Sequence, residues 1–173
     1  ALRSEEQAYQ TIMQLHADDI RQMAYYDTLT GLPNRWSFKT NLERLLARAG
    51  KDKERIGLLY IDLDNFKQVN DQYGHEAGDR LLFKFSERLG EAIRPTDQLL
   101  KPQKESLARL AGDEFVVLLP NIKEPLDASA VATRVLNLFD GGLEVDGVTH
   151  MIYASIGISV YPDDATTPTE LIH

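Results

Sequence analysis

ARLAGDEFVVLLP, from Ala108 to Pro120, is the stretch of sequence that decides the fold. An apolar segment stops at Gly112, passes through the acids Asp113 and Glu114, and resumes as FVVLL. Gly-Asp favours a tight β-hairpin turn, because both residue types tolerate positive φ angles. The stretch therefore predicts two antiparallel strands whose turn holds two carboxylates at the end of a hydrophobic sheet. Such acids either bind a hard cation or are ordinary solvated residues of the turn.

A second acidic turn follows another apolar stretch, IGLLYIDLDNF, from Ile56 to Phe66. Its continuous hydrophobicity predicts a strand that is buried on both faces and central in its sheet. The strand ends with Asp62 and Asp64, and ionised carboxylates in such a place must be paired, bound to metal or solvated. Oxygen donors at this spacing suit Mg²⁺ better than zinc, because the chain has no cysteine and only four histidines. A magnesium site and a turn with solvated acids are the two interpretations.

The composition limits the class of protein. A chain of 173 residues can bury one good core, so one domain with an appendage is expected. The formal net charge of −8 argues against nucleic acid as a partner, since a phosphate backbone requires a basic face. The lack of cysteine fits a reducing compartment, and we expect a cytoplasmic domain, whether or not the full-length protein is attached to a membrane. The sequence shows neither a bilayer-spanning apolar run nor a signal-peptide pattern.

The N-terminal segment differs from the rest, because residues 4–26 are polar and helix-prone and contain no Gly or Pro. Five residues recur at alternating spacings of four and three, namely Tyr9, Met13, His16, Ile20 and Met23. This spacing is typical of a coiled-coil seam, although about three heptads is short and His16 is a poor core residue. The alternative is a single amphipathic helix packed on its own domain. We interpret residues 1–26 as a signalling or linker helix that connects an upstream sensory domain to a domain over residues 27–173.

The remaining sequence predicts an ordered set of helices and strands. DTLTGLPNR (Asp27 to Arg35) carries a turn, and Asn34 caps a helix that we expect Gly50 to end. A strand over about 56–63, the loop VNDQYGHEAGD and a helix ending near residue 94 are expected next. Two strands follow, over about 107–111 and 114–119. The chain then continues with a hairpin closed by one long strand, THMIYASIGISVY, after a helix whose apolar face carries Leu126, Ala130, Val131, Val135, Leu138 and Phe139.

That order is β-α-β-β-α-β, the ferredoxin-like split unit, which is a mixed α/β (α+β) fold. Its first two strands are parallel and joined by a right-handed crossover, and the third strand lies between them. The turn of the central hairpin then lies at the sheet end where the first strand finishes. Asp62 and Asp113, distant in sequence, are therefore expected to meet, which favours the metal site.

Three blocks of this chain resemble the GGDEF domain of diguanylate cyclases. They are DTLTGLPNR, DLDNFKQVNDQYGHEAGDRLL and ARLAGDEFVVLLP, and nearly the whole length from Asp27 matches in order and spacing. The resemblance implies a palm-type antiparallel sheet with helices packed on it. It also implies a nucleotidyltransferase that condenses two GTP molecules into cyclic di-GMP. In a homodimer of such domains, each holds one GTP, and each 3′-hydroxyl attacks the α-phosphate of the other.

The resemblance assigns roles to individual residues. Asp62, Asp113 and the backbone carbonyl of Leu63 would bind Mg²⁺, while Glu114 would assist the 3′-hydroxyl or a second metal, so that Asp113 and Glu114 are the catalytic acids. The turn formed by Asn65, Phe66 and Lys67 would cradle the β- and γ-phosphates. Asn70 and Asp79 would read the guanine edge, because a carboxylate can accept from N1–H and the exocyclic amine together.

The family's regulatory site has counterparts as well. RPTD, residues 94–97, matches the RxxD motif where cyclic di-GMP binds as an inhibitor, so the resemblance implies a site formed by Arg94, Asp97 and Arg134. Arginine suits guanine and phosphate because its guanidinium donates two parallel hydrogen bonds. The alternative is that Arg94 and Asp97 only terminate a helix.

Three departures from the family pattern bear on activity. The first glycine of the motif is Ala111, whose methyl group takes space beside the nucleotide. The sequence stops at PTELIH, before the helix that carries a lysine and an arginine in the family, and QLLKPQKES (Gln98 to Ser106) is longer than the usual connection. These departures keep two alternatives open, a weak or silent domain acting as a cyclic di-GMP or GTP receptor, and a dimerisation platform.

Overall fold

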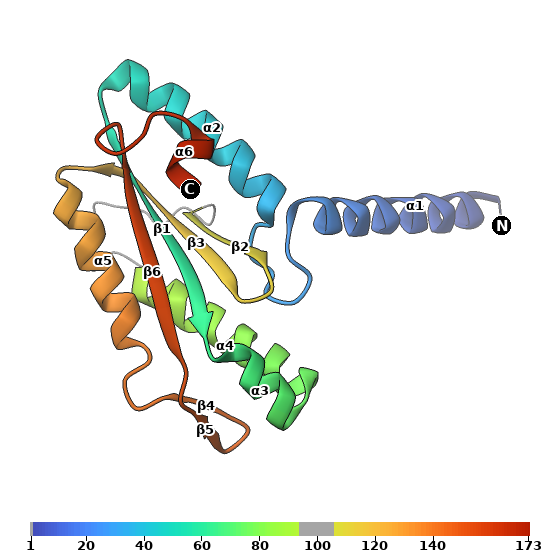
Figure 1. Ribbon diagram of the computed structural model, residues 1–173. Coiled ribbons are helices and arrows are strands. Elements are labelled where there is room, and N and C mark those ends of the chain that lie inside the picture. The colour runs from blue at the N-terminus through green and yellow to red at the C-terminus, as the bar shows by residue number, and fades with distance from the viewer. Residues whose placement is uncertain (1, 94–105) are drawn as a thin grey trace.

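The computed structural model describes residues 2–93 and 106–173, which form a sheet flanked by helices and one projecting helix (Figure 1). The helices are α1 (Leu2–Tyr25), α2 (Arg35–Asp52), α3 (Phe66–Tyr73), α4 (His75–Ile93), α5 (Pro125–Asn137) and α6 (Pro168–Ile172). The strands are β1 (Arg55–Asp64), β2 (Leu107–Ala111), β3 (Glu114–Ile122), β4 (Leu143–Val145), β5 (Val148–His150) and β6 (Tyr153–Tyr161).

The main sheet has the strand order β2-β3-β1-β6, and β4 and β5 form a separate hairpin. Strand β3 is antiparallel to both β1 and β2, so β1 and β2 are parallel and β3 lies between them. Strand β6 completes the sheet, antiparallel to β1 on its other side. The predicted ferredoxin-like order is therefore confirmed.

Strand β1 lies at the centre of the protein and carries a hydrophobic core on each face. Leu59, Ile61 and Leu63 face the core that α4 and α5 cover, whereas Ile56 and Leu58 face the core beneath α2 and α6. This alternation is the two-residue period of a strand, expressed with apolar side chains on both sides. The apolar pattern ends at Asp62, which is exposed on the α2 side of the sheet.

The segment VNDQYGHEAGD is helical, so its prediction as a loop was wrong. It forms most of α3 and the start of α4, separated at Gly74, whose φ of +88° reverses the chain direction. The short helix α3 buries Phe66 and Val69 against the core, a spacing of three that its polar composition hides. Packing against α4, rather than intrinsic propensity, stabilises a helix this short.

Helix α2 begins as predicted but does not end at Gly50. The side chain of Asn34 accepts a hydrogen bond from the backbone N–H of Ser37 at 3.0 Å, which confirms Asn34 as the N-cap. The helix continues to Asp52 and is closed by Lys53, whose φ is +56° and whose N–H bonds to the carbonyl of Ala49. Glycine weakens a helix without ending it, so the left-handed closing residue could not be located from glycine alone.

Two expectations about the C-terminal half were also wrong. The long last strand is divided into β5 and β6 at Met151 and Ile152, because the fully buried Ile152 turns into the core between them. On α5, Leu126 is 73% exposed and Ala130 is exposed. The residues that face the core are Ala128, Val131, Ala132 and Val135.

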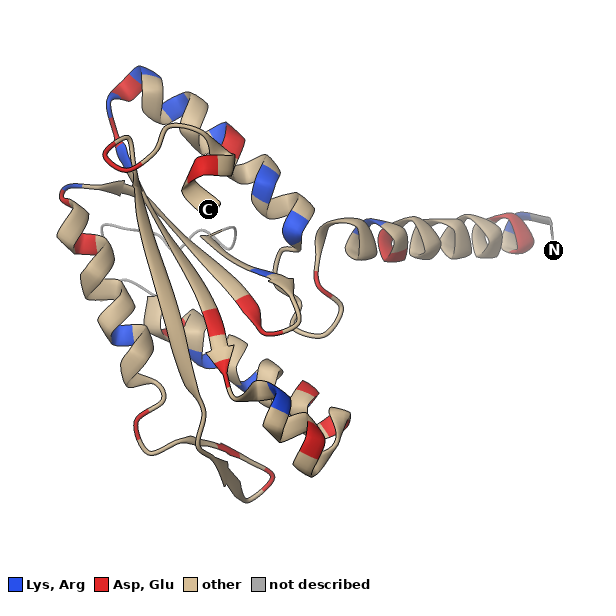
Figure 2. Ribbon diagram, in the orientation of Figure 1, with Lys and Arg blue, Asp and Glu red and all other residues tan. Residues whose placement is uncertain are grey.

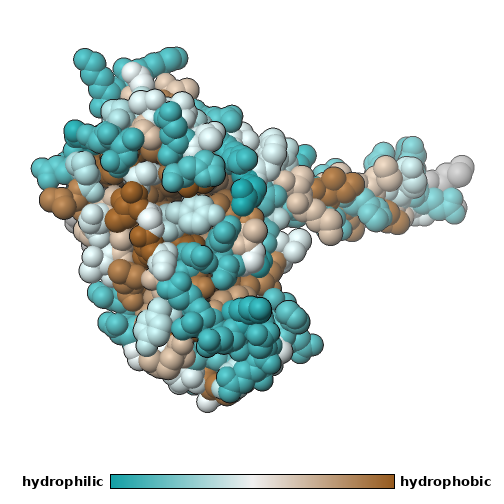
Figure 3. Space-filling model, in the orientation of Figure 1, coloured by the Kyte–Doolittle hydropathy of each residue, from teal (hydrophilic) through white to brown (hydrophobic). Residues whose placement is uncertain are grey.

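Helix α1 projects from the body of the protein (Figure 1), so it does not pack on its own domain. Apolar side chains of the predicted seam are exposed to solvent, including Tyr9, Met13, Ile20 and Met23. Figure 3 shows hydrophobic side chains along this helix. Among the described helices, α1 included, none is both long and apolar enough to cross a membrane.

The last turn of α1 is attached to the domain by side chains of the following segment. Asn34 Nδ2 donates to the carbonyl of Ala24 at 2.9 Å, and Ser37 Oγ donates to the carbonyl of Tyr25 at 2.6 Å. These bonds satisfy carbonyl groups that a helix leaves without partners at its C-terminus. The orientation of α1 is thus fixed by residues that also begin α2.

Asp27, just after α1, forms an ion pair with Arg109 of β2, with Oδ1 and Nη1 3.0 Å apart. Its carboxylate also accepts hydrogen bonds from the backbone N–H and hydroxyl of Thr30. Burial raises the pKa of Asp27, but the Thr30 hydrogen bonds and the Arg109 charge outweigh it and lower the pKa below its ordinary value. Arg109 Nε donates in addition to the carbonyl of Gly112, 2.9 Å away, in the hairpin turn.

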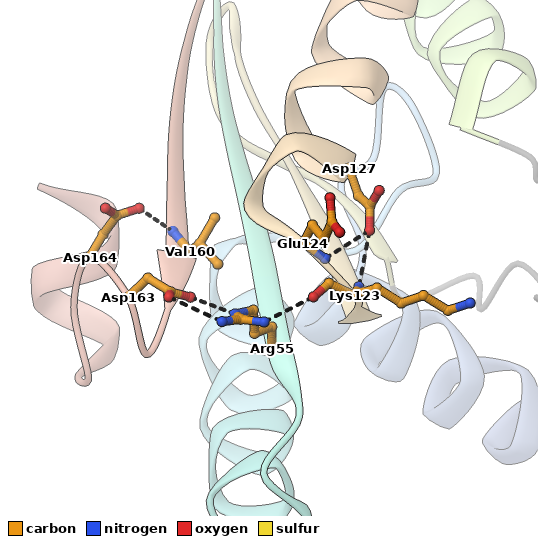
Figure 4. A network of polar contacts seen from close by, with 7 residues as sticks. All are labelled: Arg55, Lys123, Glu124, Asp127, Val160, Asp163 and Asp164. Carbon is orange, nitrogen blue, oxygen red and sulfur yellow. Dashed lines mark hydrogen bonds and ion pairs between the residues drawn. The ribbon is translucent and has the colours of Figure 1, made fainter.

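A second polar network fixes the opposite end of the sheet (Figure 4). Arg55, the first residue of β1, donates to Asp163 at 2.8 Å and to the carbonyl of Lys123 at 2.9 Å. Asp127 accepts from the backbone N–H groups of Lys123 and Glu124, which caps α5. The network joins the start of β1 to the ends of β3 and β6.

We expect Arg109→Ala to lower the free energy of unfolding at pH 7 by about 1–3 kcal/mol, because it leaves the largely buried Asp27 without its charged partner. Because the pKa of Asp27 is lowered, the pair contributes its full stability above pH 3.8, the ordinary pKa of the group. That stability is lost as the pH falls through the lowered pKa. The difference between wild type and variant should therefore shrink at acidic pH. Chemical denaturation at pH 7 and pH 3 measures the free energy of unfolding of wild type and variant, with a substitution of the exposed Arg88, Arg88→Ala, as the matched control. An equal loss in both variants would contradict the role of the pair.

Candidate active site

The turn between β2 and β3 lies beside the C-terminal end of β1. Asp62 is the register partner of Glu114, so their Cβ atoms are direct cross-strand neighbours. The N–H of Leu63 donates to the carbonyl of Asp113 at 3.2 Å, which holds the turn against β1. Acidic residues accordingly gather at this end of the sheet (Figure 2). The topology brings Asp62, Asp113 and Glu114 together, as the sequence predicted.

The backbone of the turn requires glycine at one position only. Gly112 has a φ of +46°, whereas the φ of Ala111 is not positive, so position 111 does not need the left-handed freedom of glycine. The side chain of Ala111 is exposed. The turn is further held by Arg109, a residue that the sequence reasoning did not assign, through its bond to the Gly112 carbonyl.

Negative charges accumulate around Asp62. Partial burial raises the pKa of Asp62, and the neighbouring negative charges of Asp113, Glu114 and Asp64 raise it further, together with a hydrogen bond to Asp113. Asp64 itself accepts a hydrogen bond from the hydroxyl of Ser155 at 2.8 Å. A carboxyl group whose pKa is raised by like charges is one that a bound cation would stabilise as carboxylate.

Two further residues, which the sequence reasoning missed, lie beside Glu114. Arg35 Nη2 is 3.8 Å from Glu114 Oε2, so the first residue of α2 reaches the hairpin. Burial raises the pKa of Tyr60, as does its hydrogen bond to Glu114. Tyr60 precedes Asp62 by two residues, and the period of a strand could have placed it on the same face.

The oxygen atoms of Asp62, Asp113 and Leu63 suit a hard cation that also binds a ligand. Within residues 2–93 and 106–173, no group of three His, Cys, Asp or Glu side chains could hold a metal ion alone. The predicted set needs only the carboxylates of Asp62 and Asp113 and the carbonyl of Leu63. An incomplete oxygen set is what Mg²⁺ uses when phosphates and water complete its octahedron. The residues therefore fit a Mg²⁺–nucleotide better than an isolated ion.

The predicted phosphate cradle lies where β1 passes into α3. Asn65 adopts a left-handed conformation, with φ of +66°, and the helix begins at the next residue. The side chain of Phe66 is 8% exposed and belongs to the core, so only its backbone can face a ligand. Lys67 is exposed in the first turn, where the N–H groups of a helix favour an anion.

The two predicted guanine-reading residues lie on the two helices of the α3–α4 pair, Asn70 on α3 and Asp79 on α4. The side chain of Asn70 lies against Gly78, the residue that precedes Asp79. Asp79 is exposed and lines a hollow of about 540 Å³, whereas Asn70 does not line it. The other residues that line this hollow are Leu29, Arg80, Phe83, Lys84, Glu144, Val145 and Asp146.

The predicted inhibitory site is only partly described. Arg134 is exposed on α5, which covers the sheet face opposite to the one that carries Asp62. Arg94 and Asp97, together with most of the long connection, lie outside the described residues.

Comparison with known proteins relates this geometry to a family. The sequence model described as "Diguanylate cyclase, GGDEF domain" matches residues 24–173. The chain is 36% identical over 174 residues to the diguanylate cyclase TpbB of Pseudomonas aeruginosa, covering 100% of this chain and 38% of that protein. The chain thus spans less than half the length of this relative.

Two solved structures show the same fold. The GGDEF domain of TpbB from P. aeruginosa is 37% identical, with a TM-score of 0.76 over 86% of this chain and 83% of that chain. The coiled coil and GGDEF domain of DgcB from Caulobacter crescentus, in complex with c-di-GMP, is 23% identical and has a TM-score of 0.75 over 98% of this chain and 85% of that chain. The family model matches residues 24–173, and the acids at the end of β1 lie beside those of the β2–β3 hairpin. Together these findings establish that this chain belongs to the GGDEF domain family of diguanylate cyclases.

Proposed function

We propose that this chain is the catalytic domain of a diguanylate cyclase, which joins two GTP molecules into cyclic di-GMP at a Mg²⁺-dependent site. The observation that carries the proposal is the meeting of Asp62, Asp113 and Glu114 at one end of the sheet. In phosphoryl transfer, positioning and charge neutralisation contribute more than acid–base groups. An acidic cluster beside a helix N-terminus meets that need once a cation and a triphosphate are bound.

Each residue then has a definite task. Asp62, Asp113 and the Leu63 carbonyl hold Mg²⁺, which when bound neutralises charge on the phosphates. Glu114, held by Arg35 and Tyr60, orients the 3′-hydroxyl or serves a second metal. The turn of Asn65, Phe66 and Lys67 receives the β- and γ-phosphates, and Asn70 and Asp79 select guanine.

We further propose that the active form is a homodimer. One domain carries one set of these acids, so the second GTP comes from a second copy whose site faces it. The exposed seam of α1 supplies a means of association, because two such helices can bury their apolar residues against each other. On this basis, residues 1–26 are a linker helix from an upstream sensory domain, and residues 27–173 are the catalytic domain, located in the cytoplasm where GTP is available.

No described contact favours a silent receptor domain. One reason to consider such a domain was Ala111, whose φ is not positive and whose side chain is exposed. Product inhibition at Arg94, Asp97 and Arg134 is proposed as the regulation of the enzyme, acting from the α5 side through the arrangement of the two domains.

Asp62→Asn and Asp113→Asn should each abolish formation of cyclic di-GMP from GTP and Mg²⁺, because each removes a negative charge from the cation. Both variants should remain folded, and without metal Asp62→Asn should melt at or above the wild-type temperature at pH 7, since it relieves like-charge repulsion. Chromatographic product detection and thermal melting measure these outcomes, with the exposed Glu87→Gln as control. Full activity in either variant would refute the assigned metal site.

Asp79→Ala should weaken GTP binding and relax the preference for GTP over ATP, because the paired acceptor for the guanine edge is removed. A site built to hydrogen-bond its substrate can reject a partner lacking those groups by roughly 10⁴- to 10⁵-fold. Competition binding of GTP and ATP tests this, with Glu87→Ala on the same helix as control. Unchanged selectivity would mean that another residue reads the base.

Arg94→Ala and Arg134→Ala should each weaken cyclic di-GMP binding and relieve product inhibition while initial turnover is retained. A coupling of ~1–3 kcal/mol between the sites is sufficient for regulation. Calorimetry with cyclic di-GMP, using Arg88→Ala as control, measures the binding. Equal affinity in Arg94→Ala and wild type would mean that RPTD is only a helix terminus.

A further inference from the structure

Gly78, in the second turn of α4, leaves space that another side chain occupies. A Cβ atom added at Gly78 would lie 1.8 Å from Asn70 Oδ1 and 2.9 Å from Asn70 Cγ, well inside van der Waals contact. Phe66 Cζ would be 3.2 Å away on a further side. The carboxamide of Asn70 therefore rests on the Cα of Gly78, in the volume that any other residue would fill.

The backbone around this contact leaves little freedom to either helix. The Asn70 carbonyl accepts the N–H of Gly74 at 2.9 Å, and the Gly74 carbonyl accepts the N–H of Gly78 at 3.2 Å. The buried ring of Phe66 anchors the start of α3 in the core. A methyl group at Gly78 would therefore displace the partly exposed Asn70 side chain, which can rotate toward solvent, more readily than it would separate α3 from α4.

The position of Asn70 matters because Asn70 and Asp79 are the two residues proposed above to select guanine. An amide offers both a donor and an acceptor, whereas a carboxylate only accepts. Guanine presents acceptors at O6 and N7 and donors at N1 and its amine, so these two side chains complement it jointly. Adenine lacks the N1 proton and carries a donor where guanine has O6, so it cannot satisfy the same pair.

We propose that Gly78 is a positioning residue for base selection, whose missing side chain leaves room for the Asn70 carboxamide in the position from which it recognises a guanine nucleotide. This inference rests on the proposed function and deepens it. Gly78 does not touch the base; it acts through Asn70.

The test compares Gly78→Ala with Gly90→Ala. Gly90 lies in the same helix, and no described atom is within 4 Å of a Cβ added there, so both variants gain the same helix propensity but only one clashes. Calorimetry with the α,β-methylene analogues of GTP and ATP measures binding without turnover. We expect Gly78→Ala to bind the GTP analogue at least tenfold more weakly, to bind the ATP analogue as wild type does, and so to lose selectivity. Gly90→Ala should match wild type with both.

A double variant isolates the steric cause. In an Asn70→Ala background the space beside Gly78 is free, so adding Gly78→Ala should change GTP-analogue affinity by less than twofold. Should Gly78→Ala alone melt at a lower temperature, the double variant should recover it if Asn70 is the obstructing group. The inference would be overturned if Gly78→Ala kept wild-type selectivity, or if the two substitutions had additive effects on GTP-analogue affinity. It would also be overturned if Gly78→Ala lowered the melting temperature and the double variant did not recover it. Lack of GTP preference in the wild type itself would instead count against the proposed function.

Discussion

Pairing of β1 with strands on both sides is the constraint on which the rest of this structure depends. Because β3 and β6 flank β1, its side chains are buried on both faces, and every apolar residue from Ile56 to Leu63 has a core to enter. The same register sets Asp62 opposite Glu114. A shift of β1 by one residue would turn Asp62 toward the core that α4 and α5 cover, so burial and site geometry enforce each other.

The hairpin turn is held from several directions. Leu63 bonds to Asp113, Arg109 bonds to Gly112, and Arg35 lies near Glu114. These contacts draw on β1, β2 and the start of α2, and Arg109 in turn is held by Asp27 at the end of α1. Polar contacts therefore run from the end of the projecting helix, through Asp27 and Arg109, to the acidic turn.

Glycines divide into two kinds in this chain, and only one kind can be read from local sequence. Gly112 and Gly74 take positive φ angles at turns, for which their sequence context provides a signal. Gly78 is helical, and its lack of a side chain matters only because Asn70 crosses to it from another helix. At Gly50 the sequence predicted the end of a helix, but α2 continues beyond it to Asp52.

The sequence by itself determined the order of the main-sheet strands, the N-cap at Asn34 and the meeting of Asp62 with Asp113, because each follows from short-range periodicity or from topology. Only the tertiary structure decided that the seam of α1 is exposed and not packed on its own domain. The sequence did not reveal that α3 is a helix, since two buried residues in a polar segment form too weak a pattern, nor the break at Ile152. The partners of Glu114 and the contact of Asn70 with Gly78 were decided by tertiary structure alone. Such contacts join segments whose spacing in space is set by packing of the whole core, and no local pattern of residues encodes that distance.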